Sequence, residues 1–396
     1  MYFQFAILLA IILTYSIIAG KVERYPVSAP IIFLTIGLIL GPIALHVFNF
    51  NFNRENYQLL SEFALALVLF SDASKANLKV LKHHFALPSK LLLIGLPLTI
   101  LLGYVIARIL FPQFSWIEAA ILSTILAPTD AALGEPVVSN KSVPSKIREG
   151  INVESGLNDG ICVPILLLLI AAQKVQHIET SSFSYGLSLF ADEIGLGIIV
   201  GASIALVGAI LIKQGVKNGW IESSWRTTII ILISLSSFTF AQALGGSGFI
   251  ACFVGGITFN ITFNLNKPEF LEGSQGVGKI LNAVVWLIFG SVITGWILPQ
   301  LTLEIILYSL LSLTLIRILP VLLTLFNHKI SLYAKLFTAW FGPRGLASIV
   351  FAAMVLDVNL PHGNTIVVIA LLTILFSVFA HGISANPMAK AFLKSN

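Results

Sequence analysis

Two carboxylates, a hydroxyl and an amide lie together in an apolar stretch of this chain. The run is Glu154-Ser155-Gly156-Leu157-Asn158-Asp159-Gly160, and it continues as a strongly hydrophobic segment, Ile161 to Ile170. An ionised side chain at bilayer depth costs roughly 2.5–3.5 kcal/mol on insertion scales, so such residues usually line a pathway or pair with a partner. The run therefore indicates a functional site inside a membrane.

The polar residues of this run are spaced for one helix. Ser155 and Asp159 are four positions apart, as are Glu154 and Asn158. Four-residue spacing places each pair on one face of an α-helix. The pattern predicts an oxygen-rich site for a cation, with the carboxylate of Asp159 at its deep end.

Composition sets the class of protein. The 396 residues are 57% hydrophobic and 10% charged, whereas a soluble domain carries about 25% charged residues. We predict an all-α polytopic membrane protein that spans the bilayer. Only two cysteines are present, which excludes a disulfide framework.

Hydrophobic segments near the roughly 20 residues that a bilayer requires predict about thirteen spans. Their approximate limits are 3–20, 26–44, 57–72, 90–111, 116–138, 147–172, 189–213, 225–244, 247–264, 277–298, 303–325, 332–355 and 363–386. Lysine and arginine gather in alternate loops, and basic residues favour the cytoplasmic side. The sequence thus predicts an outside N-terminus and a cytoplasmic C-terminus. The first span lacks a basic region before it and an obvious small-residue cleavage site before Lys21, so we expect it to be retained. The net charge of +5 reflects this topology and gives no indication of nucleic-acid binding.

Two of the predicted spans are interrupted near mid-depth. The fifth contains Ala127-Pro128-Thr129-Asp130-Ala131 and the twelfth contains Gly342-Pro343-Arg344-Gly345. Proline removes a backbone donor and breaks the helix. The two spans are seven apart, so both are fifth if spans 1–6 and 8–13 form two inverted six-helix repeats. Broken helices at matching positions of inverted repeats point to a transporter site at the bilayer midplane.

Charged residues accompany both breaks. Half-helix N-termini carry partial positive charge and C-termini partial negative charge. We expect Asp130 to neutralise the positive ends and Arg344 the negative ends, the alternative being a direct pair between the two. Thr129 offers a hydroxyl and a free carbonyl as further cation ligands.

Glu154 needs a positive partner, which leaves Asp159 as the carboxylate available for exchange. Arg317 on the eleventh span lies at similar depth, roughly 10–12 Å from the cytoplasmic end at 1.5 Å per residue. Arg344 is the alternative partner. A buried pair of this kind would be structural, since removal of one member strands a charge at a cost of about 3–5 kcal/mol.

These motifs together resemble the cation:proton antiporter superfamily, in its NhaP-type sodium/proton exchanger branch (monovalent cation:proton antiporter-1). The resemblance is carried by the Glu154-to-Gly160 run, by Thr129-Asp130, by Gly342-Pro343-Arg344-Gly345, and by the glycine-rich segment from Gly246 to Gly256. They occur in the family's order over most of the chain. Two departures are Ala131, where many members have proline, and the lack of a long cytosolic tail in the sequence at hand.

The resemblance implies an antiporter fold with crossed interrupted helices, assembled as a homodimer in the cell membrane. It implies a transport core at 90–172 and 303–386, a dimerisation domain at 3–72 and 225–298, a connecting helix at 189–213 and a short tail at 387–396. Cation binding falls to Asp159 with Ser155, Thr129, Asn158 and Asp130, and Asn158 marks the electroneutral branch.

The expected function is electroneutral exchange of a monovalent cation for a proton by alternating access. The alternatives are a cation channel and a sodium-coupled symporter of organic solutes on a similar fold. An enzyme is not expected, because the motifs of intramembrane proteases are missing from the spans. We expect no cofactor beyond the transported ion, and the choice among sodium, potassium and lithium stays open.

Overall fold

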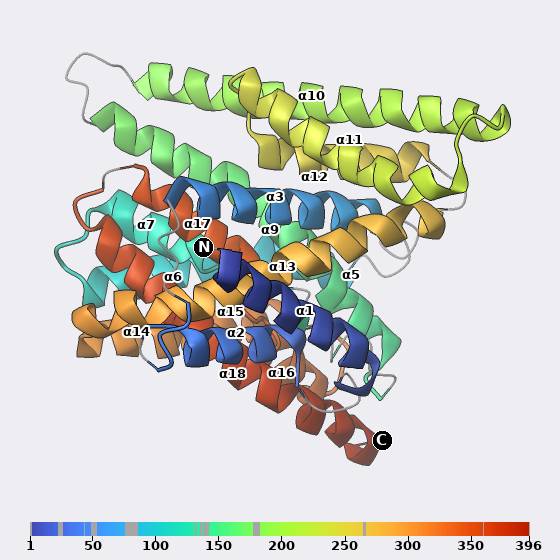
Figure 1. Ribbon diagram of the computed structural model, residues 1–396. Helices are drawn as coiled ribbons and strands as arrows, with labels where there is room; N and C mark the ends of the chain where they lie inside the picture. The colour runs from blue at the N-terminus through green and yellow to red at the C-terminus, as the bar shows by residue number, and fades with distance from the viewer. Residues whose placement is uncertain are drawn as a thin grey trace. The chain divides into compact units, whose positions relative to one another are not determined.

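The computed structural model describes residues 2–22, 27–42, 44–48, 54–75, 86–130, 133–134, 137, 142–176, 183–263, 267–358 and 360–395. These residues fold almost entirely as helices (Figure 1). Eight of the described helices are long and apolar enough to cross a membrane. The prediction of a polytopic helical membrane fold is therefore confirmed.

Each predicted span contains helix in the part of the chain that the structure describes. The helices are α1 (Tyr2–Val22), α2 (Ala29–Leu40), α3 (Arg54–Lys75), α5 (Ala86–Lys90), the π-helix η1 (Leu91–Gly95), α6 (Leu96–Leu110), α7 (Trp116–Ile125), α9 (Ser145–Gln176), α10 (Phe183–Lys217), α11 (Ser223–Ala243), α12 (Gly248–Thr262), α13 (Lys267–Ile297), the short 3-10 turn η2 (Leu298–Gln300), α14 (Leu303–Leu313), α15 (Leu315–Thr324), α16 (Leu332–Trp340), α17 (Leu346–Leu356) and α18 (Gly363–Ser395).

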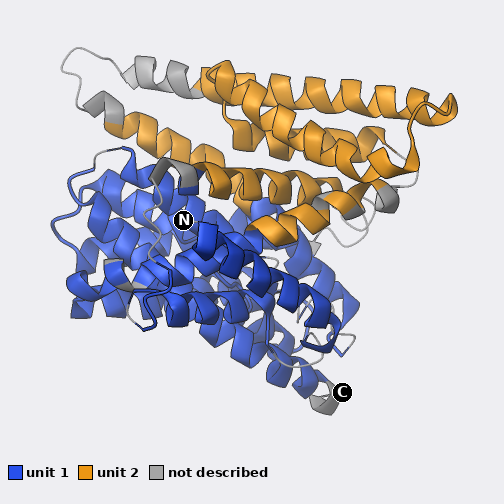
Figure 2. Cartoon of the chain, in the orientation of Figure 1, with its two compact units in different colours: residues 1–58, 79–158, 282–396 blue, residues 59–78, 159–281 orange. Residues whose placement is uncertain are grey.

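The chain forms two compact units (Figure 2). The first comprises residues 1–58, 79–158 and 282–396, and the second comprises 59–78 and 159–281. Helix α9 belongs to both, since the division falls between Asn158 and Asp159. The domain limits expected from the family resemblance stay a prediction.

The first unit holds both predicted breaks. Helix α7 ends at Ile125, and Ala127 to Asp130 are not helical. Helix α16 ends at Trp340, and α17 begins only at Leu346. In both segments the proline cannot donate the backbone hydrogen bond that would continue the helix.

Glycine permits a close helix crossing in the same unit. A Cβ at Gly37 of α2 would overlap the carbonyl oxygen of Leu287 on α13, and one at Gly290 would overlap that of Leu34. Small residues at such points let backbones approach in membrane proteins, where dispersion contacts rather than the hydrophobic effect hold helices together.

The second unit packs α10, α11 and α12 with the part of α3 from residue 59 onward. Hydrogen bonds from side chain to backbone join these helices, from Ser74 to the Gly256 carbonyl (3.3 Å) and from Asn260 to the Ala73 carbonyl (3.2 Å). The glycine-rich segment seen in the sequence begins at the turn before α12, where Ser247 is the N-cap and accepts from the Ile250 amide.

Two local irregularities were not expected from the sequence. The π-turn of η1 ends at Gly95, two residues before Pro97, whose ring is incompatible with regular helix one turn earlier. The predicted eleventh span is divided at Thr314 into α14 and α15. The Thr314 hydroxyl donates to the Leu310 carbonyl at 2.7 Å, a type of bond that bends helices.

Candidate functional site: crossed helix breaks beside a buried hydroxyl–amide cluster

The two breaks meet through their backbones. The Asp130 amide donates to the carbonyl oxygen of Pro343 at 2.7 Å. A proline carbonyl in an unwound segment has no helical donor, so this bond satisfies it and fixes one break against the other.

The Asp130 carboxylate accepts from two backbone amides. Its Oδ1 accepts from the Leu133 amide (3.1 Å), and its Oδ2 accepts from the Leu346 amide at the first turn of α17 (2.8 Å). The Asp130 carbonyl also accepts from the Gly134 amide at 3.2 Å. A negative charge at the partially positive start of α17 is electrostatically favourable.

Arg344 donates hydrogen bonds at the C-terminal end of α7. It is fully buried, and its Nη1 donates to the carbonyls of Ala127 (2.7 Å) and Pro128 (3.0 Å) just beyond the last turn of that helix. These carbonyls have lost their helical donors at the break, so the guanidinium gives them both hydrogen bonds and an opposing charge. Ser348 adds a bond to the Ile125 carbonyl at 2.8 Å.

Both glycines of the second break lie against a charged side chain. A Cβ at Gly342 would overlap Nε of Arg317, and a Cβ at Gly345 would overlap the Asp130 carboxylate. Each of the four residues from Gly342 to Gly345 therefore has a role in this contact. The two glycines leave space for charged side chains, Pro343 supplies a carbonyl acceptor, and Arg344 supplies a positively charged guanidinium.

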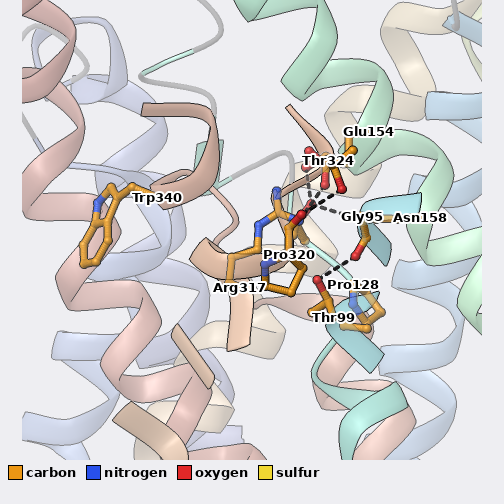
Figure 3. Close-up of polar contacts among 12 residues, drawn as sticks. Gly95, Thr99, Pro128, Glu154, Asn158, Arg317, Pro320, Thr324 and Trp340 are labelled. Carbon is orange, nitrogen blue, oxygen red and sulfur yellow. Dashed lines mark hydrogen bonds and ion pairs between the residues drawn. The ribbon is translucent and has the colours of Figure 1, made fainter. Parts of the chain in front are cut away.

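Glu154 and Arg317 form an ion pair, with Oε1 of Glu154 2.6 Å from Nη1 of Arg317 (Figure 3). Both residues are buried, at 2% and 1% exposure. Of the two partners considered from the sequence, the structure brings Arg317 to this carboxylate. Loss of either member would leave its partner charged in an apolar interior.

A cluster of hydroxyl and amide groups, defined by Thr129, Ser155 and Asn158, lies where the first break meets α9. Oγ of Ser155 is 2.8 Å from Oγ1 of Thr129, and Nδ2 of Asn158 donates to Oγ1 of Thr129 at 2.7 Å. All three side chains are buried. The Oδ1 oxygen of Asn158 has no hydrogen-bond partner among the described residues, so it is a buried acceptor.

Asp159 is the next residue of α9 after Asn158 and lies one helical turn beyond Ser155. Its side chain is buried, with 8% exposure. The structure thus brings Thr129, Ser155 and Asn158 together and joins Glu154 to Arg317. It places Asp130 at the Leu346 amide and Arg344 at the carbonyls of Ala127 and Pro128.

Sequence reasoning missed Glu118, whose carboxylate joins the starts of two helices. Its Oε2 accepts from the Ser115 amide in a capping box at the start of α7, and its Oε1 accepts from the His362 amide before α18, each at 2.8 Å. The Ser-x-x-Glu spacing was a readable signal for the first contact, whereas the second spans 244 residues of chain.

A protein-family comparison agrees with this architecture. The family described as "Sodium/hydrogen exchanger, transmembrane" matches residues 7–391. A curated relative from Shewanella sp. (strain MR-4), "K(+)/H(+) antiporter NhaP2", is 24% identical over 98% of this chain and 67% of its own length. The "Na(+)/H(+) antiporter" of Saccharomyces cerevisiae is 26% identical over 80% of this chain and 34% of its own.

A solved structure shares the fold. The structure titled as the sodium proton antiporter MjNhaP1 from Methanocaldococcus jannaschii at pH 8 aligns with a TM-score of 0.78 at 19% identity, over 96% of this chain and 98% of that one. The chain spans about two thirds of the length of the Shewanella relatives.

Proposed function

This chain belongs to the transmembrane sodium/hydrogen exchanger family, and from that premise we propose that it exchanges a monovalent cation for a proton across a membrane. The single observation that carries the proposal is the buried cluster of Thr129, Ser155 and Asn158, of which Ser155 and Asn158 lie in α9 within one turn before Asp159. Hydroxyl, amide and carboxylate oxygens are the ligands that hard cations take in proteins.

We propose that Asp159 binds either a proton or a dehydrated cation, and never both. A carboxylate that accepts a proton loses the charge that attracts the cation, so the two ligands compete for one group. The hydroxyls of Thr129 and Ser155 and the Oδ1 oxygen of Asn158 would replace part of the cation's hydration shell.

In the proposed exchange, the charges of the residues around Asp159 stay the same. Glu154 is neutralised by Arg317 at 2.6 Å, and each oxygen of the Asp130 carboxylate accepts a backbone amide. With these groups unchanged, Asp159 gains one negative charge on losing its proton, and one monovalent cation cancels that charge. The exchange is then electroneutral, one cation for one proton.

The transported cation is proposed as a class. Names of the relatives include both potassium/proton and sodium/proton antiporters, and the ligand chemistry is the same for sodium, potassium and lithium. We further propose a homodimer in the cell membrane, an outside N-terminus and a cytoplasmic C-terminus. Alternating access would come from movement of the predicted core (90–172, 303–386) against the predicted dimerisation domain (3–72, 225–298).

The proposal is tested by cation-driven proton flux in everted membrane vesicles. Chloride salts of sodium, potassium and lithium are added separately to vesicles that contain the wild type or Asp159→Asn. We expect at least one cation to drive proton movement in the wild type without any organic solute, and none in the variant. Flux in folded Asp159→Asn equal to wild type would exclude Asp159 as the exchanging group.

A further inference from the structure

A polar stripe on α18 lies outside the cluster and the ion pair described above. Ser377, His381 and Ser384 follow one another at intervals of four and three residues, which places them on one face of the helix. Ser377 and His381 are buried, at 0% and 1% exposure. A polar stripe on a helix that is otherwise apolar needs a reason, because each buried polar group must find a partner.

Each member of the stripe contacts a residue that flanks or lies in the second break. Oγ of Ser377 accepts from the Arg344 amide at 2.6 Å. Nε2 of His381 is 2.9 Å from the carbonyl oxygen of Trp340, the last residue of α16. The indole Nε1 of Trp340 donates to Oγ of Ser384 at 2.8 Å. Helix α18 therefore holds the unwound segment from both of its ends.

Each ring nitrogen of His381 faces a backbone carbonyl oxygen, Nε2 that of Trp340 at 2.9 Å and Nδ1 that of Ser377 at 3.0 Å. A carbonyl oxygen only accepts, so a ring nitrogen that carries hydrogen donates to the carbonyl it faces. Nδ1 also lies 3.1 Å from Oγ of Ser377, and that oxygen accepts from the Arg344 amide. These contacts form a relay from the Arg344 amide through Ser377 and His381 to the Trp340 carbonyl.

The relay fixes groups on which the candidate site depends. Arg344 reaches the α7 carbonyls from this segment, and the Pro343 carbonyl accepts from Asp130. Without Ser377 the Arg344 amide would lose its acceptor in a buried position, at a cost comparable to a lost hydrogen bond. We then expect the segment from Trp340 to Arg344 to shift or to become helical.

We propose that Ser377 and His381 are positioning residues for the cation site, acting through the Trp340-to-Arg344 segment. The expected effect on transport rests on the proposed function, whereas the expected effect on the structure of the segment rests on geometry alone. Neither residue touches the cation, and both determine where Arg344 and Asp130 stand relative to Thr129.

The experiment compares Ser377→Ala with a matched control on the same helix, Thr373→Val. The Thr373 hydroxyl is also fully buried, and it donates to the Ile369 carbonyl of its own helix at 2.7 Å. For the imidazole, His381→Leu removes the ring nitrogen that faces the Trp340 carbonyl, whereas His381→Gln supplies an amide that can donate to that carbonyl. Backbone hydrogen exchange of the peptide covering 340–346 is measured by mass spectrometry on the purified full chain, and apparent KM and maximal rate are measured in vesicles.

We expect Ser377→Ala and His381→Leu to exchange hydrogen about fivefold faster in this peptide and to raise the apparent KM for the cation about fivefold, as the loss of one hydrogen bond predicts. Thr373→Val should stay within about twofold of wild type for both quantities, and His381→Gln should recover most of the loss. If a positioning variant fails to fold, the remaining variant of the pair supplies the result.

Unchanged hydrogen exchange at 340–346 in both Ser377→Ala and His381→Leu would overturn the inference, as would equal effects in Thr373→Val. The two proposals fail separately. A wild type without cation-driven proton flux contradicts the proposed function, while the hydrogen-exchange comparison still decides the positioning role.

Discussion

Single side chains at the two breaks provide hydrogen bonds that the backbone of a continuous helix would otherwise make. Asp130 accepts from two backbone amides and Arg344 donates to two backbone carbonyls, so a carboxylate and a guanidinium replace the missing helical hydrogen bonds. The absence of a side chain matters equally at Gly345, which lies against the Asp130 carboxylate.

Substitution of Gly345 tests this close approach. Gly345→Ala should displace Asp130 and lower the exchange rate by about tenfold or more, because overpacking costs about 1–3 kcal/mol. Gly295 is the control, since a Cβ there meets nothing within 4 Å. Gly295→Ala should leave the rate of cation-driven proton flux unchanged, and equal losses in both variants would mean that the approach to Asp130 is not the cause.

A second residue-scale prediction concerns the Glu154–Arg317 ion pair. Glu154→Ala should lower the melting temperature of the purified protein more than Asp159→Asn does, because it strands a buried guanidinium at a cost of about 3–5 kcal/mol. Arg317→Ala added to Glu154→Ala should recover part of that loss. A double variant whose loss equals the sum of the single losses would show that the two residues are not energetically coupled.

Whole elements are joined by contacts between residues far apart in sequence. The Glu118 carboxylate lies at the start of α7 and accepts from the amide that precedes α18, and its exposure is 1%. A charge at the positive ends of two helices stabilises both starts at once.

Removal of this charge tests the joint. Glu118→Gln should lower the free energy of unfolding by about 1.5–3 kcal/mol, the usual contribution of a hydrogen bond to a charged group. Glu304, also in the first turn of its helix but exposed, is the matched control. Glu304→Gln should shift the melting temperature little. A loss in the control as large as in Glu118→Gln would contradict a specific role for the α7–α18 joint.

Local chemistry explains which features of the helices could be predicted from the sequence. Proline and glycine mark the breaks at Pro128 and Gly342, and a charge in an apolar span demands a partner, so the membrane fold, the family and the class of cation/proton antiporter were predictable and are confirmed by the comparisons. Hydrophobic periodicity does not indicate which helices pair across the chain. The contact between Ser377 and Arg344 and the division of the span at Thr314 were therefore not predicted.

At the scale of the whole molecule, the proposed exchange moves no net charge across the membrane. Glu154 is paired with Arg317 and Asp130 accepts from backbone amides. In the proposed exchange Asp159 alone changes its charge, and the cation compensates that change. Membrane potential does about 2.3 kcal/mol of work per elementary charge per 100 mV, and a cycle that moves no net charge cannot use that work.

Electroneutrality is tested in liposomes that contain the purified protein. A potassium/valinomycin potential of either sign is imposed with the pH gradient held at zero, and exchange of sodium or lithium for protons is followed. We expect the exchange rate to be independent of the potential. A rate that rises with one sign and falls with the other would show that net charge crosses the membrane, and that a second group, with Asp130 the first to examine, titrates during the cycle.

The central claim is that proton and cation compete for Asp159. Titration calorimetry of the purified protein with the cation that drives flux, in buffers of different ionisation heat, counts the protons released per cation bound. We expect this number to rise toward about one as the pH is lowered and the carboxylate becomes protonated before the cation binds. Cation binding with no proton release at any pH, or the same release in Asp159→Asn, would contradict it.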